Sequence, residues 1–544
     1  MKKIIIGLLA VMIASQYSCK KFLNITPINM LTGNNYYKSA NDVETNINDM
    51  YGQLFAKYVQ TNTAGGTGEF RSGEVIPSNN TVGTRALRQD AGLIGGHTRT
   101  VSFSGTTNGF QNIPGSPVND RTNFLAAMNE FAPSGAINHY EFWHLQSWNE
   151  YYQVIQQANI LVDKLNEGIP GVSASQIKGY IEEAKFIRCY CYFFMVRLYG
   201  DVAYYTAAYQ KDPLPRMNMV EVINNCIADL TPGKADLDWA ITNPSLKGVR
   251  ASRGAVYGLL MNMYMWNAGF DPTHKTQYYQ TTEQLGQELE ADNGHGFQLL
   301  DLTQWNTVTK GRSVESLFEL FTTVNYTGGT PVSQYAQFGE SFIHFPYRLP
   351  EYDNRTSPCV FTAAYMQKLY PDTHDGRLDT WFDSPFDQNA ESFQMKKFAG
   401  NTFLDSSQPG NNAIPDATFL IMRYADAILL HAEASAELGH EEEAINELNK
   451  VRTRRGATAY PDATGDGNLK DRIFWERAKE LMGEGSHYFD LVRTGRIKNR
   501  AYTDNPLTQD KFQRGGWTWP IDASAINNDP YMTLNTYWLG TGIE

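Results

Sequence analysis

Apolar residues recur at helical spacing in three parts of the chain. Within residues 423–493 they lie three or four positions apart, so that they share one face of a helix. Many of them are alanines, and small residues on a buried face let two helices pack closely, as in stacked helical hairpins. The pattern predicts an all-α, tetratricopeptide-like scaffold over about residues 40–60, 143–270 and 418–495, without a fixed repeat length.

Two long segments separate these helical parts, at about residues 61–140 and 296–415. The first is rich in Gly, Thr and Asn, and the second combines many prolines with scattered aromatic residues. Irregular segments of this length inside a compact domain are more often functional than idle. Within the second, SVESLFELF is consistent with a strand and AAYMQKLY with a short helix. We expect one domain over residues 19–544.

The N-terminus has the pattern of an export signal. Two lysines precede an apolar run that is too short to span a bilayer comfortably, and Ser18 then precedes Cys19. The arrangement resembles a bacterial lipoprotein signal, in which the cysteine is acylated and becomes the first residue. Gln16 and Tyr17 depart from the usual pattern, and the alternative is a secretory signal with an incidental cysteine. We expect residues 1–18 to be removed and Cys19 to anchor the protein to a membrane.

Composition narrows the function classes. Among 544 residues, 58 acidic side chains outnumber 46 basic ones, which argues against a general affinity for nucleic acid. No CxxC pair or complete calcium-loop pattern occurs, so that we expect no metal and no cofactor. The remaining cysteines are interpreted as small buried apolar residues, although an exported protein could pair some of them: Cys189, Cys191, Cys226 and Cys359.

One pair of carboxylates is spaced so that the two could serve as an acid and a base in catalysis. Glu480 and Glu484 lie one helical turn apart, and a glycoside hydrolase needs two carboxylates across the scissile bond. However, Arg477, Lys479 and Arg493 lie nearby in the sequence, and ion pairing within the helical block explains the charges equally well. We favour the structural interpretation, and extend it to three further charged residues: Arg423, Asp426 and Glu433.

The same region carries a family resemblance. RYAD begins at Arg423, AEA at Ala432 and ERA at Glu476, and FDLVR ends at Arg493. With EEAKFIRCYCYFFMVRLYGD earlier in the chain, these motifs resemble the SusD/RagB family of outer-membrane nutrient-binding lipoproteins. His487 stands where the family usually has Arg.

The resemblance implies a tetratricopeptide-like helical bundle whose long loops form the ligand site. It also implies a protein without catalytic activity, anchored at the outer membrane and exposed at the cell surface. Such a protein captures a glycan or a peptide and acts as the lid of a TonB-dependent, SusC-like transporter. We expect a glycan ligand, with peptide capture as the alternative and glycoside hydrolysis as the least favoured interpretation.

Residues in the irregular segments and just after the first of them, most of them aromatic, are the candidate ligand contacts. A flat ring can cover the apolar C–H face of a sugar while Asn, Asp or Arg bind its hydroxyls. Each residue alone is more often a packing residue than a contact, so that the hypothesis concerns the group: Phe103, Phe110, Asn112, Tyr140, Trp143, Tyr326, Tyr335, Phe338 and Trp381.

Overall fold

The computed structural model describes residues 36–60, 66–77, 147–322, 338–349, 357, 359–389, 391–403, 413–461, 467–521 and 523–539. The signal segment and Cys19 lie outside these residues, as does most of the first irregular segment.

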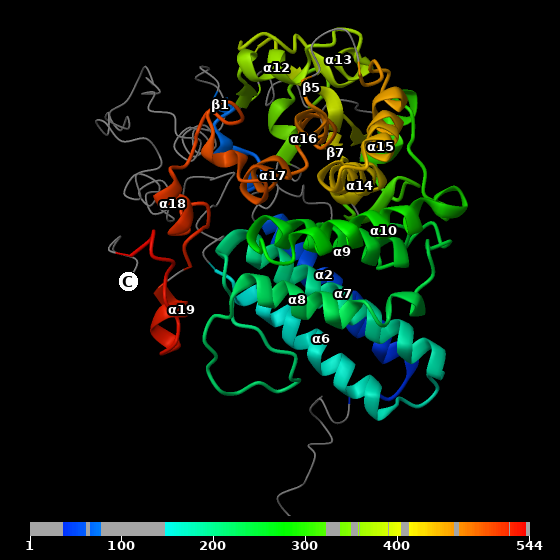
Figure 1. The fold of residues 1–544 in the computed structure, drawn as a ribbon. Coiled ribbons are helices and arrows are strands. Elements are labelled where there is room, and N and C mark those ends of the chain that lie inside the picture. The colour runs from blue at the N-terminus through cyan, green and yellow to red at the C-terminus, as the bar shows by residue number, and fades with distance from the viewer. Residues whose placement is uncertain are drawn as a thin grey trace, which may run out of the picture.

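Helices dominate the described residues, as predicted, and stack side by side in sequence order (Figure 1). Successive neighbours α6 to α10 pack on one another, α2 packs on α6, and α10 packs on α14, which carries α15 and α16. The bounds of these helices are α2 (Ala40–Gln60), α6 (Asn149–Glu167), α7 (Ala174–Tyr199), α8 (Met219–Leu230), α9 (Arg253–Phe270), α10 (Lys275–Gly294), α14 (Tyr424–Leu438), α15 (Glu441–Arg454), α16 (Leu469–Glu480) and α17 (His487–Arg493).

Local sequence signals explain where these helices begin and end. A capping box starts α7, in which the Ser173 hydroxyl accepts the N–H of Gln176 and the Gln176 side chain accepts the N–H of Ser173. Gly439 ends α14 in the left-handed conformation, with φ 84°, and lets the chain turn into α15. The predicted apolar faces of this hairpin are buried, including Leu429 on α14 and Leu448 on α15.

Two helical assignments differ from the sequence pattern. Helix α10 was not predicted because its sequence is largely polar, yet it buries Leu285 and Leu289 between α9 and α14. The segment GKADLDWAI was expected to be helical but forms only a 3-10 turn, η3 (Lys234–Asp236). Its Trp239 stacks on the His295 ring at 3.9 Å, so that tertiary packing overrides local propensity there.

Short strands and helices fill the described part of the second irregular segment. The predicted strand at SVESLFELF is confirmed as β2 (Ser316–Leu320), which pairs antiparallel with β8 (Phe419–Arg423). The predicted short helix is confirmed as α12 (Ala363–Leu369). The other pairs are β1 with β3, β4 with β5, and β6 with β7. Their bounds, with those of the short helices, are β1 (Val75–Pro77), β3 (Cys359–Phe361), β4 (Phe382–Asp383), β5 (Gln394–Met395), β6 (Asn401–Phe403), β7 (Ala413–Pro415), α11 (Trp305–Thr309) and α13 (Gly376–Trp381).

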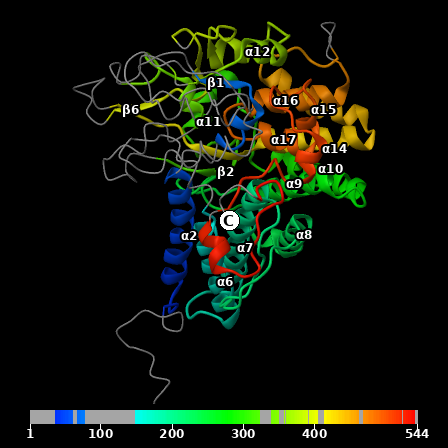
Figure 2. The same cartoon turned by 90° about the vertical axis from the view of Figure 1, so that its left-hand side faces the viewer.

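After α17 the chain returns toward the N-terminal helices through α18 (Gln509–Gln513) and α19 (Ala523–Asn528) (Figure 2). We call residues 509–539 the C-terminal segment. The guanidinium of Arg71 donates hydrogen bonds to three of its carbonyl groups, those of residues 516, 517 and 518, at 2.5, 2.6 and 2.9 Å. The Trp519 N–H donates to the carbonyl of Leu198 near the end of α7, at 2.7 Å. These bonds hold the segment across the helical stack.

Cys189, Cys191, Cys226 and Cys359 are buried and carry free thiols, as the apolar interpretation predicted. None of the helices in the described part of the chain combines the length and the hydropathy that a membrane-spanning helix requires.

The approach of α9 to α17 generates a stability prediction. A Cβ atom added at Gly269 would lie 2.0 Å from the Arg493 carbonyl oxygen, so that the two backbones must separate. We expect Gly269→Ala to lower the free energy of unfolding by about 1–3 kcal/mol, the usual cost of overpacking. The measurement is thermal unfolding followed by circular dichroism.

The matched control is Gly52→Ala on α2, where an added Cβ meets nothing within 4 Å. Alanine has the higher helix propensity, so that this variant should melt at the wild-type temperature or above it. Equal melting temperatures for the two variants would contradict the close approach of α9 and α17.

Candidate functional site

The carboxylates singled out in the sequence lie in a buried cluster of ion pairs. Glu480, at the end of α16, contacts Arg455 at 2.8 Å, Arg423 at 3.0 Å and Arg377 at 3.1 Å. Glu315 shares two of these arginines, Arg423 at 2.5 Å and Arg455 at 2.7 Å. All five side chains are fully buried. We call them the Glu480 cluster.

Glu484 links the Glu480 cluster to Lys397, another residue of the second irregular segment. Its carboxylate lies 2.7 Å from the Arg423 guanidinium and 2.5 Å from the Lys397 ammonium. Lys397 also donates to the carbonyl oxygens of residues 480 and 482, at 2.7 and 2.9 Å. Burial lowers the pKa of Lys397 to about 8, although Glu484 opposes the shift.

This environment does not suit a general acid. Burial alone would raise the pKa of Glu480, but Arg455 and Arg423 outweigh it and hold that pKa well below its usual range. Arg423 and Lys397 likewise lower the pKa of Glu484 against the effect of burial. A proton donor at neutral pH needs a raised pKa and access to its substrate. The structural interpretation of the pair is therefore the better one.

Glu480 and Glu484 do not pair with the cations that lie nearest to them in the sequence, Arg477, Lys479 and Arg493, which have other partners. Arg477 pairs with Asp426 at 2.8 Å and Asp490 at 3.0 Å, and Arg493 pairs with Glu433 at 2.6 Å. These bonds tie α14, α16 and α17 together, as expected for the charged residues of the helical block. The third neighbour, Lys479, contacts two other carboxylates, Asp375 and Glu476.

Trp381 is the one proposed ligand residue whose side chain the structure describes. It is fully buried, 4.6 Å from the Trp305 ring and 4.5 Å from the Lys397 ammonium. It therefore has no exposed face for a sugar ring and packs beside the Glu480 cluster. Phe338 begins the 3-10 helix η6 (Phe338–Phe342), and its side chain lies outside the description. The other candidates lie outside the described residues: Phe103, Phe110, Asn112, Tyr140, Trp143, Tyr326 and Tyr335.

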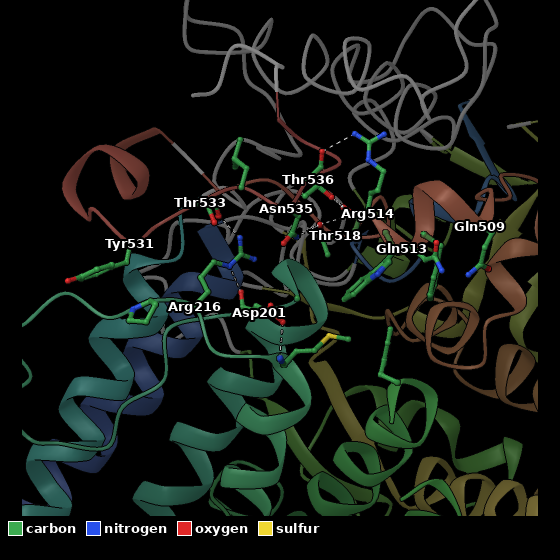
Figure 3. A pocket seen from close by; sticks show the side chains of 18 residues that line it. Asp201, Arg216, Gln509, Gln513, Arg514, Thr518, Tyr531, Thr533, Asn535 and Thr536 are labelled. Atoms are coloured by element: carbon green, nitrogen blue, oxygen red, sulfur yellow. Dashed lines mark hydrogen bonds between the residues drawn. The ribbon is translucent and has the colours of Figure 1, made fainter. Parts of the chain in front are cut away.

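A cavity with a volume of about 560 Å³ lies under the C-terminal segment (Figure 3). We call it the Arg216 cavity. The end of α7, the start of α8 and the end of α9 form one part of its wall, and residues from 509 to 536 form the rest. Its volume lies within the usual range of small-molecule sites. The sequence did not predict this cavity, because its wall joins segments that lie far apart along the chain.

Arg216 joins the walls of this cavity. Its guanidinium donates to the carbonyl oxygens of Tyr199, Asp201 and Thr533, at 2.6, 2.7 and 2.7 Å. Among the described residues, no carboxylate forms an ion pair with it. The Asp201 carboxylate accepts the N–H of Met219 at the start of α8, at 2.9 Å. Burial lowers the pKa of Arg216, and the Asp201 charge opposes this shift.

The C-terminal wall combines polar groups with aromatic rings. The Arg514 guanidinium donates to the carbonyl oxygen of Thr536 at 3.0 Å. The Asp510 carboxylate lies 3.6 Å from the same guanidinium. The Phe512 ring stacks on Phe270 at 6.2 Å, with an interplanar angle of 3°. At the rim the Tyr531 side chain is 57% exposed. Further hydrogen-bonding groups come from three amides: Gln509, Gln513 and Asn535.

A second cavity, of about 280 Å³, lies on the other side of residues 213–216 and 531–534. We call it the Tyr152 cavity. The Tyr152 ring stacks on Tyr205 at 6.0 Å, and two carboxylates, Asp212 and Asp529, line it as well. The two cavities thus share the C-terminal segment but differ in charge.

A metal-like grouping occurs elsewhere, between α10, α14 and α15. Ligand atoms of Glu290, His431 and Glu447 lie within 4.8 Å of one another. The Lys450 ammonium lies 2.6 Å from both glutamates, and the His431 ring bonds Glu290 at 2.8 Å and Glu443 at 3.0 Å. These side chains already supply cations to the carboxylates, so that we do not assign a metal site.

Family models match two adjoining parts of the chain. The model described as "SusD family" matches residues 265–538, and that described as "Starch-binding associating with outer membrane" matches residues 112–265. A SusD homolog of known structure from Bacteroides thetaiotaomicron VPI-5482 is 31% identical, with a TM-score of 0.76 over 92% of this chain and 98% of the homolog.

Two other relatives are more distant. SusD-like protein P38 of Formosa agariphila is 24% identical over 440 residues, which cover 71% of this chain and 78% of the relative. The structure of "Surface glycan-binding protein A" from Bacteroides uniformis is 17% identical and has a TM-score of 0.62 over 91% of this chain and 99% of that protein, so that it shows the common fold.

The Glu480 cluster generates the next prediction. Replacing Glu480 by Gln leaves three buried guanidiniums with one carboxylate fewer, and breaking a buried ion pair costs about 3–5 kcal/mol. We expect Glu480→Gln to lower the free energy of unfolding by roughly that amount, measured by urea denaturation. Glu442→Gln, an exposed position on α15, is the matched control. Equal midpoints for the two variants would contradict a structural role of the cluster.

Proposed function

Because the chain belongs to the SusD family, as its motifs predicted, we propose that it captures a glycan at the cell surface and delivers it to a TonB-dependent, SusC-like transporter. Proteins of the SusD family bind glycans at the cell surface and associate with the outer membrane. The family is one of binding proteins rather than enzymes. Delivery, the lipid anchor on Cys19 and the contacts with the sugar are parts of this proposal.

The observation that carries the proposal is the extent of the family match. The two family models together span residues 112–538, and the solved SusD homolog covers 92% of the chain. The match includes the segments that form the Glu480 cluster and those that form the Arg216 cavity. A shared scaffold of this extent supports a shared role.

The geometry supports binding rather than hydrolysis. The Glu480 cluster turns its carboxylates inward, where arginines neutralise them. In contrast, the Arg216 cavity offers amides, guanidiniums and an exposed tyrosine ring, which are groups that can bind hydroxyls and cover the face of a sugar. Such groups hold a ligand without supplying an acid and a base on either side of a bond.

We propose that ligand contacts also come from the irregular segments. The candidate residues remain Phe103, Phe110, Asn112, Tyr140, Trp143, Tyr326, Tyr335 and Phe338. Trp381 is not among them, because its buried ring packs on Trp305.

The experiment is a glycan panel tested by affinity gel electrophoresis and isothermal titration. We expect the mature protein to bind at least one polysaccharide and to release no reducing ends from it. Trp143→Ala should weaken binding at least about tenfold, or 1.4 kcal/mol, because a stacking surface is lost. Tyr209→Ala is the matched control, since its ring is 52% exposed but lines neither cavity.

Two outcomes would contradict the proposal. Absence of binding to every glycan, together with peptides found by mass spectrometry in the purified protein, would favour peptide capture by the same scaffold. Release of reducing ends that disappears in the Glu480→Gln variant, at conditions where that variant is folded, would instead favour the hydrolase hypothesis.

A further inference from the structure

We propose that the Arg216 cavity binds an acidic saccharide, with the carboxylate of a uronic acid residue facing Arg216 and Arg514. The inference rests on the proposed glycan-binding function and adds a chemical class of ligand and a place for it. The cavity lies between the α7 end, the α8 start and the C-terminal segment.

The described lining of the Arg216 cavity carries more positive than negative formal charge. Among the described residues that line the cavity, two are arginines, Arg216 and Arg514, and one has a carboxylate, Asp201. Asp201 already accepts the Met219 N–H, and its backbone carbonyl, rather than its carboxylate, accepts from Arg216. The wall therefore keeps an excess of positive charge.

Arg216 donates its hydrogen bonds to neutral groups among the described residues. Its three hydrogen bonds end on backbone carbonyl groups, which satisfy donors but carry no net charge. Arg216 is half-buried, and a guanidinium without an ion pair there is screened less by solvent than one at the open surface. An anion that enters the cavity gains from that charge, and a neutral ligand does not.

Arg514 provides the accessible half of the site. Its side chain is 42% exposed and, among the described residues, donates one hydrogen bond, to the Thr536 carbonyl oxygen. The nearby Asp510 carboxylate is 3.6 Å away and 74% exposed, so that the pair is a weak one at the surface. Arg514 can thus turn toward a ligand carboxylate, which a guanidinium binds through two parallel hydrogen bonds.

The remaining lining groups suit a sugar. The amides of Gln509 and Gln513 and the exposed ring of Tyr531 lie around the same cavity (Figure 3). Amides exchange hydrogen bonds with ring hydroxyls, and the tyrosine ring offers an apolar surface. Arg216 fixes the C-terminal segment by its bond to Thr533, so that these groups are positioned before a ligand binds.

The Tyr152 cavity provides an internal contrast. Among the described residues its lining includes two carboxylates, those of Asp212 and Asp529, and no lysine or arginine. A uronic acid residue would be repelled there. An oligosaccharide that spans both cavities should therefore place its acidic residue in the Arg216 cavity and a neutral residue against Tyr152 and Tyr205.

The test uses isothermal titration of the mature protein with trigalacturonate and trimannuronate, and with their methyl esters. Esterification removes the charge and preserves the sugar backbone. We expect at least one of the two acids to bind, and its methyl ester to bind at least about tenfold more weakly. The affinity for the acid should also fall as NaCl is raised from about 50 to 500 mM, because the screening length then shortens about threefold.

The variant is Arg514→Gln, since Arg216 also holds the fold and its removal would confuse the two effects. We expect about a tenfold loss of affinity for the acid and little change for the ester, with Arg514→Lys recovering part of the loss. Arg500→Gln removes one exposed positive charge outside the cavity and is the matched control. Melting temperatures check that all three variants are folded.

Failure of this inference can be told from failure of the proposed function. Binding of neutral glycans but of neither acid would overturn the inference and leave glycan capture intact. Equal affinity for acid and ester, or an unchanged affinity in Arg514→Gln, would also overturn it. Absence of binding to any saccharide would overturn both.

Discussion

The fold depends on the neutralisation of arginines inside it. A buried guanidinium is tolerated only where carboxylates and carbonyl groups replace the water it loses. Glu480 meets this requirement for three arginines at once: Arg377 in α13, Arg423 at the end of β8, and Arg455 after α15. These segments must therefore meet at the end of α16. Glu315, Arg377 and Lys397 all belong to the second irregular segment, so that these ion pairs fix that segment to the helical scaffold.

The same side-chain chemistry has a different outcome at the C-terminal segment. Arg71 and Arg216 hold that segment through backbone carbonyl groups rather than through carboxylates. The bonds position the segment over the α7 end and leave the Arg216 cavity beneath it. In the Glu480 cluster every arginine is paired with at least one buried carboxylate, and the residues are structural. In the Arg216 cavity positive charge remains, beside groups that can bind a sugar. The difference separates the part of the protein that maintains the fold from a part that can hold a ligand.

The helical scaffold could be predicted from the sequence because its spacing is local. Leu429 and Leu448 lie on the predicted faces, and the family motifs lie on the same helices. The sequence did not predict helix α10, because polar residues interrupt its buried face. Long-range partners could not be predicted either, since Arg377 is 103 positions from Glu480 and no local pattern links them. Trp381 shows the corresponding limit for the site, because an aromatic residue in an irregular segment has no period that tells a core position from an exposed one.

The most direct measurement is a crystal structure of the protein with an oligosaccharide that it binds. We expect the sugar to contact the Arg216 cavity or the candidate residues of the irregular segments. We also expect that no sugar atom contacts Glu480 and that this carboxylate keeps its three arginine partners. A sugar lying between Glu480 and Glu484, with those ion pairs broken, would contradict the separation of the structural cluster from the ligand site.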